Sequence, residues 1–268
     1  MKEKVVIITG GSSGIGKALA TTFGKNGSKV IITGRKHEEL NATVEELKAL
    51  GIEVTGIQGD VSSPEENKRM VDATVKKYGG IDVLINNAGI SMRALFEELN
   101  YEVIKRVMDI NFFGAVNMTH QCLPYLLKSK GIVVGISSIA GYRGLPGRTG
   151  YSASKFALNG FLESLRAEMI NKGVHVLIAS PGFTGSNIRK RSLTKDGTPQ
   201  GDSPREEEKM MTPEECAHHI YRATVKRKKV LILTAQGRWT VFLNKWFPGM
   251  MDKVAYEAMA REENSPFK

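Results

Sequence analysis

Tyr151 and Lys155 are the two side chains whose types and spacing most directly suggest chemistry. They stand four residues apart in a stretch whose apolar residues recur at helical spacing, so a helix would place both on one face. A phenol with its ordinary pKa of about 10 is a poor base at neutral pH, but a neighbouring ammonium stabilises the phenolate and lowers that pKa. The pair could therefore give and take a proton. One such spacing is weak evidence on its own, because it arises readily by chance in a chain with seven tyrosines.

Ser138 and Asn111 are polar residues that could act together with this pair. Ser138 lies just beyond a predicted strand that ends at Ile136, where a hydroxyl could hold a carbonyl oxygen. Asn111 lies in a predicted helix within Asp109-Ile110-Asn111-Phe112. Each residue alone could equally be a cap, a turn or a buried polar group.

A glycine-rich turn follows the first apolar run, Val5 to Ile8, and precedes a helical pattern. In Thr9-Gly10-Gly11-Ser12-Ser13-Gly14-Ile15-Gly16 the glycines suit a tight turn, a close approach to a pyrophosphate and close helix packing, while the helix start offers free N–H groups. A plain turn is the alternative, which the strand before and the helix after disfavour. The predicted dinucleotide contacts here are Gly10, Ser12, Ser13, Gly14, Ile15 and Gly16.

The residues after the second predicted strand bear on the choice of dinucleotide. Thr33-Gly34-Arg35-Lys36 contains no acid to accept from a ribose 2′-OH, and Arg35 could pair with a 2′-phosphate through two N–H bonds. We therefore predict NADP(H), with a surface cation at the start of a helix as the alternative for Arg35. Asp60 and Val61, after the third strand, are predicted to bracket the adenine, although Asp60 could instead cap a turn or helix.

The elements that would position these residues alternate regularly along the chain. Short apolar runs are separated by stretches long enough for a crossover helix, which predicts an α/β, Rossmann-like, doubly wound, seven-stranded parallel sheet with helices on both faces. We expect one catalytic domain over residues 1–268, with a substrate lid or a disordered loop at 183–212 and a C-terminal extension at 236–268. The predicted strands are Val5–Ile8, Lys29–Thr33, Glu53–Gln58, Ile81–Ile85, Ile132–Ile136, Val174–Ala179 and Val230–Thr234.

Composition narrows the classes of partner and location. The net charge of +10 would suit nucleic acid, an anionic membrane surface, a phosphorylated small molecule or a solvated surface, but no nucleic-acid-binding motif is present. Cys122 and Cys216 have no metal-ligand spacing, so no metal is expected. The apolar run near Met1 is too short for a signal peptide or a membrane span, which favours a cytoplasmic protein and leaves peripheral membrane association open.

Together these motifs resemble one family, the short-chain dehydrogenases/reductases (SDRs), over roughly residues 4 to 235. The resemblance implies that Tyr151 is the general acid for carbonyl reduction, that Ser138 and Tyr151 hold the substrate, and that Lys155 lowers the tyrosine pKa and holds the nicotinamide ribose. It also implies that Asn111 anchors a water-linked proton relay, and that the protein forms homodimers or homotetramers. The motifs are Thr9-Gly10-x-x-x-Gly14-x-Gly16, Asn86-Asn87-Ala88-Gly89, Asn111, Ser138, Tyr151-x-x-x-Lys155 and Pro181-Gly182. Further cofactor contacts implied by it are Asn86, Ala88, Gly89, Pro181, Gly182, Thr184 and Ser186.

The substrate is predicted from the chain's last segment, whose aromatic residues and basic neighbours resemble the SDR branch that reduces steroid and long-chain sphingoid ketones. A small hydrophobic ketone or alcohol is therefore the expected substrate, although Arg189, Lys190, Arg191 and residues 205–209 leave an anionic one open. The segment could cover the active site, seal a dimer or rest on a membrane. Its residues are Arg238, Trp239, Val241, Phe242, Lys245, Trp246, Phe247, Met250 and Lys253.

Three alternatives remain, one within the enzyme class and two from other classes of protein. A 3-oxoacyl thioester reductase would share the whole catalytic set. A non-catalytic dinucleotide-binding regulator would have no reason to keep Asn111, Ser138, Tyr151 and Lys155 together. A membrane- or nucleic-acid-binding module would explain the charge but not the glycine turn.

Overall fold

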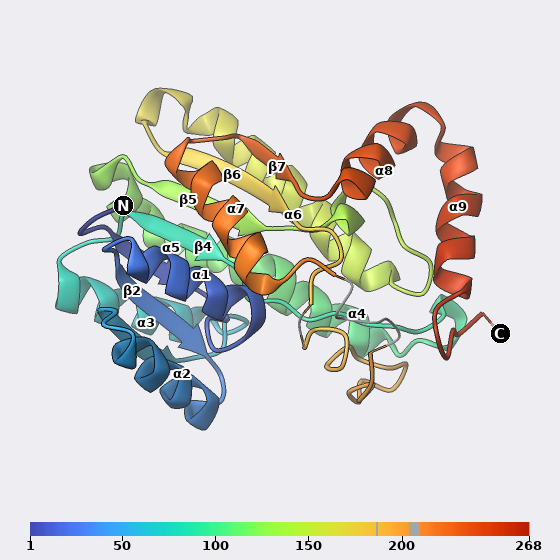
Figure 1. The fold of residues 1–268 in the computed structure, drawn as a ribbon, viewed down its shortest axis with the longest axis horizontal. Coiled ribbons are helices and arrows are strands. Elements are labelled where there is room, and N and C mark those ends of the chain that lie inside the picture. The colour runs from blue at the N-terminus through green and yellow to red at the C-terminus, as the bar shows by residue number, and fades with distance from the viewer. Residues whose placement is uncertain (186, 204–209, 268) are drawn as a thin grey trace.

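Seven parallel strands form one sheet in the order β3-β2-β1-β4-β5-β6-β7 (Figure 1). The computed structural model describes residues 1–185, 187–203 and 210–267. Strands β2 and β3 are added on one side of β1, and β4 to β7 are added on its other side. Doubly wound folds bind ligands at this switch point in the strand order, between β1 and β4. The predicted Rossmann-like parallel sheet is therefore confirmed. The strands are β1 (Val5–Ile8), β2 (Lys29–Gly34), β3 (Val54–Gln58), β4 (Val83–Asn86), β5 (Ile132–Ile136), β6 (His175–Ser180) and β7 (Val230–Ile232).

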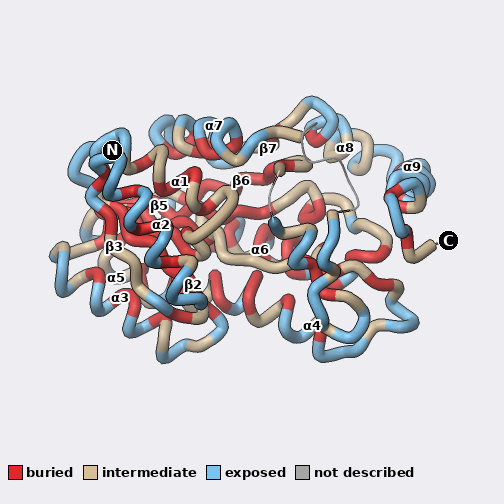
Figure 2. The backbone as a smooth tube through the Cα atoms, turned by 60° about the horizontal axis from the view of Figure 1, so that its bottom comes forward, coloured by how far each residue is buried: buried red, intermediate tan, exposed pale blue. Residues whose placement is uncertain are grey.

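Helices cover both faces of the sheet, and each face has its own buried core. One core packs Leu19 of α1 and Ile220 of α7 against the sheet, and the other packs Met118 of α5 and Leu162 of α6. The inner strands β1, β4 and β5 are buried along their whole length, whereas the edge strands β3 and β7 are partly exposed (Figure 2). The helices of these layers are α1 (Gly14–Lys25), α2 (His37–Ala49), α3 (Pro64–Tyr78), α4 (Tyr101–Met108), α5 (Gly114–Ser129), α6 (Thr149–Glu168) and α7 (Pro213–Val225).

The last strand is shorter than predicted, because Thr234 begins a new element. Thr234 has a φ of +66°, and its hydroxyl accepts a hydrogen bond of 3.0 Å from the Gly237 N–H. It is thus the N-cap of α8 (Ala235–Trp246), which α9 (Pro248–Ala260) follows. The α8–α9 hairpin stands on the side of the molecule toward which the strands point (Figure 1).

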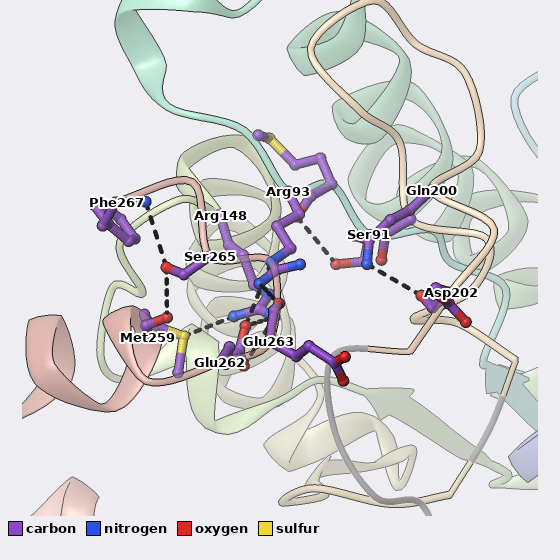
Figure 3. A network of polar contacts seen from close by, with 12 residues as sticks. Ser91, Arg93, Arg148, Gln200, Asp202, Met259, Glu262, Glu263, Ser265 and Phe267 are labelled. Atoms are coloured by element: carbon purple, nitrogen blue, oxygen red, sulfur yellow. Dashed lines mark hydrogen bonds and ion pairs between the residues drawn. The ribbon is translucent and has the colours of Figure 1, made fainter.

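The chain end beyond α9 is held against the body by buried charges. Glu262 accepts hydrogen bonds of 3.2 and 2.9 Å from Arg148 and lies 3.5 Å from the Arg93 Nε, as Figure 3 shows. Arg93 follows β4, and Arg148 directly precedes α6. The C-terminal segment therefore closes onto the two segments that flank the end of the sheet. None of the described helices is both long and apolar enough to cross a bilayer.

Candidate active site

The glycine-rich turn between β1 and α1 has the close backbone approach that its sequence predicts. Gly10 has a φ of +63°, a conformation that costs glycine little. A Cβ on Gly16 would lie 2.2 Å from the Gly10 carbonyl oxygen, so only glycine lets α1 begin this close to the strand. Ser13 is the N-cap of α1, but its side chain makes no cap hydrogen bond. The N–H groups of the first turn of α1 therefore remain available for an anion.

One cavity of about 470 Å³ runs from this turn to Tyr151. It lies beyond the carboxyl ends of the strands, where doubly wound folds bind ligands. Most of the predicted site residues line it: Gly10, Ser12, Ser13, Gly14, Ile15, Gly16, Arg35, Asp60, Val61, Ala88, Gly89, Ser138, Tyr151, Lys155, Pro181, Gly182 and Thr184. Two predicted residues, Asn86 and Asn111, are not among its lining residues. Ser186 and residues 205–209 lie outside the described residues.

Asn86 is predicted to contact the dinucleotide, but its side chain does not line the cavity. Its side chain is buried and donates a 2.9 Å hydrogen bond to the Thr119 hydroxyl of α5. Its neighbour Asn87 lines the cavity and donates to the carbonyl oxygens of Thr9 and Gly10 at 2.8 and 3.0 Å. Successive side chains of an extended chain point to opposite faces, so one of two adjacent asparagines had to turn away. The side chain at the cavity is therefore that of Asn87, and a dinucleotide contact of Asn86 stays a prediction.

Asn111 lies in a π-helical turn, Asp109–Phe113, between α4 and α5. Its Oδ1 accepts from the Ile90 N–H at 2.8 Å, and its Nδ2 donates to the Ile90 carbonyl and the Ser154 hydroxyl, both at 2.9 Å. The asparagine thereby ties the segment after β4 to α6, next to Lys155. Its role in a proton relay stays a prediction.

Helix α6 places Tyr151 and Lys155 on one face beside Ser138. The Lys155 Nζ lies 5.8 Å from the centroid of the Tyr151 ring and donates a 2.8 Å hydrogen bond to the Ile136 carbonyl at the end of β5. Lys155 is only 4% exposed, and this burial lowers its pKa to about 8. The predicted catalytic lysine is thus held by the strand that also precedes Ser138.

Tyr151 has a pKa above its ordinary value of 10.0, chiefly because the phenol is buried. A hydrogen bond with Ser138 and the positive charges of Arg148 and Arg189 act in the opposite direction and lower that pKa. Tyr151 is therefore protonated at neutral pH and is placed to donate a proton. The lowering effect predicted for Lys155 stays a prediction, whereas the effect of the two arginines was not foreseen.

At the other end of the cavity, charges of both signs surround Arg35. Its Nη1 lies 3.6 Å from an Asp60 carboxylate oxygen. Glu39 in the first turn of α2 also lines the cavity, where it accepts hydrogen bonds from Lys36 and from Arg191. The sequence showed the short spacing from Lys36 to Glu39, but nothing in it could reveal that Arg191, far along the chain, reaches the same carboxylate.

Sequence reasoning also missed residues that hold the two ends of the cavity in place. Arg148 lines the cavity and pairs with Glu262, which is itself 3% exposed in its side chain (Figure 3). The Thr9 hydroxyl accepts from the N–H groups of Asn87 and Ala88 at 3.0 and 2.9 Å, which fixes the loop after β4. Thr9 stood inside the glycine motif and could have been chosen, but Glu262 carries no signal in the sequence.

A doubly wound sheet with a glycine-rich turn at its first crossover, and with Ser138, Tyr151 and Lys155 beyond β5, defines the Rossmann-like class of dinucleotide-dependent enzymes. Residues 4–197 match the family model described as short chain dehydrogenase, and the chain belongs to this family, the SDR oxidoreductases.

Several relatives align over most of the chain. The chain is 34% identical to dehydrogenase/reductase SDR family member 7B of Danio rerio, over 95% of this chain and 85% of that protein. A Dictyostelium discoideum protein named dehydrogenase/reductase SDR family protein 7-like is 34% identical over 96% and 82%. The predicted family is therefore confirmed.

Two solved structures share the fold. An SDR from Burkholderia phymatum in complex with NAD has a TM-score of 0.83 at 23% identity, covering 93% of this chain and 95% of that one. An alcohol dehydrogenase from Thermococcus sibiricus, complexed with 5-hydroxy-NADP, has a TM-score of 0.75 at 24% identity, covering 86% and 94%.

Proposed function

We propose that this SDR interconverts a hydrophobic ketone and its secondary alcohol with NADP(H). The observation that carries the proposal is the placement of the Ser138 and Tyr151 side chains, with Lys155 beside them, in the cavity that begins at the glycine turn. Such a pair can hold a carbonyl oxygen and supply its proton.

The cavity fits a dinucleotide in its donors and acceptors. The buried hydroxyls of Thr33 and Ser137 have no hydrogen-bond partner within the described part of the chain, and both residues line the cavity. The start of α1 would bind the pyrophosphate, and Lys155 would hold the nicotinamide ribose. When bound, the cofactor supplies or accepts the hydride. The protein supplies alignment and the proton.

For reduction, the chain's own residues act on the carbonyl oxygen. Ser138 orients that oxygen by a hydrogen bond, and the Tyr151 hydroxyl gives it a proton as it becomes an alcohol. The raised pKa of Tyr151 keeps this proton in place at neutral pH. The nearby cations Lys155, Arg148 and Arg189 stabilise the phenolate that is left. In alcohol oxidation the same proton moves back to Tyr151.

Tyr151→Phe tests this assignment directly. The variant should lose ketone reduction while NADPH binding, followed by fluorescence titration, stays near that of the parent protein. Ser138→Ala should lower kcat and leave NADPH affinity unchanged. Substantial turnover by Tyr151→Phe would refute the acid role of the phenol.

The preference for NADP(H) rests on the cations around the end of β2. Arg35, Lys36 and Arg191 outnumber Glu39 and Asp60 there, which favours a 2′-phosphate. Because hydrogen bonds to charged groups contribute about 1.5–3 kcal/mol, Arg35→Asp should weaken NADPH binding about ten- to hundredfold and NADH binding far less. Lys48→Asp, at the far end of α2, is the matched control. Unchanged selectivity in Arg35→Asp would sink the cofactor assignment.

Apolar side chains at the substrate end of the cavity favour a hydrophobic ketone. They are Ile90, Leu145, Phe183, Ile188 and Leu193. We propose that residues 183–212 act as the substrate lid of a single domain over residues 1–268, with 236–268 as an extension. Exposed Phe113, directly before α5, and exposed Phe156 on α6 favour these helices as a homodimer face.

The substrate class can be tested by NADPH consumption with steroid ketones, 3-ketosphinganine, 3-oxoacyl thioesters and small polar ketones. Turnover confined to the first two would support a hydrophobic ketone. Turnover of thioesters alone would make this chain a 3-oxoacyl thioester reductase, and turnover of small polar ketones alone would exclude the hydrophobic substrate.

A further inference from the structure

Both helices of the α8–α9 hairpin carry large exposed apolar residues. On α8, Trp239, Phe242 and Trp246 follow one another at helical spacing and are all exposed, with both tryptophans more than 60% exposed. From Phe247 onward, Met250 and Val254 repeat the same spacing along α9. We call these six residues the hairpin face. Figure 2 shows that both helices are exposed over much of their length.

The inner side of the hairpin is fixed to the protein, so the hairpin face is held in place. Met251, Ala255 and Met259 are buried along an adjacent side of α9. Arg143 forms an ion pair with Asp252 and donates a 3.0 Å hydrogen bond to Asn244. The buried Glu262 cluster then secures the chain end (Figure 3). An exposed apolar surface on a rigid support marks an interaction site.

Most of the charges around the hairpin face are positive, and Glu257, one turn beyond Val254, pairs with Arg261. Arg238, Lys245 and Lys253 are exposed beside it, and Lys245 lies 5.7 Å from the centroid of the Trp246 ring. Asp252 is the only acidic residue between Ala235 and Tyr256, and Arg143 pairs with it. Aromatic side chains with basic neighbours match the boundary between the headgroups and acyl chains of an anionic bilayer. We propose that the hairpin face docks this protein on an anionic phospholipid surface.

A second copy of the chain fits this surface less well. A two-fold contact would bring Lys245 and Lys253 of each copy toward the same residues of the other, and like charges oppose that approach. Phe113, directly before α5, and Phe156 on α6 offer separate exposed apolar side chains for association between copies. An anionic bilayer instead satisfies the aromatic residues and the cations together.

The α8–α9 hairpin contacts the candidate active site at the start of α8. Gly237 packs against Ile139, the residue after Ser138, and Thr234 packs against Gly182, which lines the cavity. A ketone dissolved in the bilayer would therefore meet the protein close to the cavity. This use of the surface for substrate delivery rests on the proposed function, whereas docking itself does not.

Both tryptophans of the chain lie on α8, so its tryptophan fluorescence reports on the hairpin face alone. With vesicles of phosphatidylglycerol and phosphatidylcholine, the emission should shift to the blue, and brominated lipids should quench it. Vesicles of phosphatidylcholine alone should bind more weakly. No shift and no quenching with the anionic vesicles would overturn the proposal.

Two variants separate the apolar and the charge contributions in a vesicle co-sedimentation assay. Lys245→Glu/Lys253→Glu should weaken binding to anionic vesicles by about thirtyfold or more, because each cation near such a surface contributes about fivefold. Phe242→Glu/Phe247→Glu should also weaken binding by at least about tenfold, because two apolar contacts are lost. Ile170→Glu replaces an exposed apolar residue elsewhere and should bind like the parent protein. Equal binding by all three variants would refute the surface.

Two further measurements distinguish lipid binding from self-association, and distinguish docking from the proposed ketone turnover. Self-association without lipid that Phe242→Glu/Phe247→Glu abolishes would assign the hairpin face to a second copy and overturn the lipid proposal. If docking holds, the same variant should turn over a water-soluble ketone normally and lose turnover of a vesicle-borne one. Absence of ketone turnover in the parent protein would defeat the proposed function, while the fluorescence result would still decide docking.

Discussion

Glu262→Gln should destabilise the protein strongly although it changes one atom in the C-terminal segment. The carboxylate is 3% exposed in its side chain and pairs with Arg148 through two hydrogen bonds and with Arg93 at 3.5 Å. An amide cannot carry the charge that compensates two guanidinium groups, which are 10% and 7% exposed. Removing one partner of a buried ion pair costs about 3–5 kcal/mol. For a chain of this length that corresponds to a fall in Tm of about 5–9 °C.

Glu262→Gln should also lower the pKa of Tyr151, the proposed acid. Releasing Arg148 from its carboxylate increases the positive potential at Tyr151, whose pKa the Arg148 charge already lowers. The other charged groups that face the Tyr151 end of the cavity are Arg189, Lys155 on the same helix and Arg106 from α4. Reduction needs the protonated phenol, so the high-pH limb of the kcat profile should move to lower pH.

Urea unfolding, thermal melts and the pH profile of kcat, all on the full chain, test both effects. Glu263→Gln changes an exposed neighbour and should leave all three near parental values, whereas Glu262→Asp should recover part of the loss. A change of less than about 1 kcal/mol for Glu262→Gln would refute the argument from burial. An unchanged pH limb with reduced stability would limit Glu262 to a structural role.

Two further outcomes follow from other parts of the structure. Burial lowers the pKa of Lys155 from 10.5 to about 8. Between these two pH values the unfolded chain binds the Lys155 proton more tightly than the folded chain does. The free energy of unfolding should therefore rise by up to about 3 kcal/mol as pH increases from about 8 to 10.5. Lys155→Met should remove this rise, and urea unfolding of the cofactor-free protein at both ends of the window measures it; a parallel rise in the variant would contradict the assignment. Thr212 and Glu215 form a reciprocal capping box at the start of α7, so Thr212→Ala should cost about 1 kcal/mol in the same assay, and no loss would show that the cap is dispensable.

The fold could be predicted from the sequence because the signals for each element are local. A parallel strand buried on both faces is a short apolar run, and a crossover needs enough residues for a helix, so β1 and β5 match their predicted bounds. The predicted end of β7 was wrong because Thr234 is β-branched, and β-branched residues are typical of strands. Its cap to α8 depends on a positive φ that composition does not reveal.

The candidate site was predicted where a motif fixes both residue type and position. The glycine turn and the spacing of Tyr151 and Lys155 are motifs of this kind, and the residues line one cavity. The sequence did not show which of the adjacent Asn86 and Asn87 side chains faces the cavity, because that depends on how the end of β4 is oriented. Arg191 and Glu262 were missed because their partners lie far away in the sequence, and no local pattern encodes such pairs.

The predicted catalytic residues and the α8–α9 hairpin lie in different parts of the chain. The family match ends at residue 197, and Ser138, Tyr151 and Lys155 all lie before that residue. The α8–α9 hairpin and Glu262 lie beyond it, yet the alignment with the Danio rerio relative covers 95% of the chain and so must extend into this segment. Arg148 belongs to the first part and Glu262 to the second, and their contact makes the position of a cavity-lining cation depend on the docked chain end. A substitution that releases the C-terminal segment should therefore change the pKa of Tyr151 through Arg148, even though the substituted residue does not touch Tyr151.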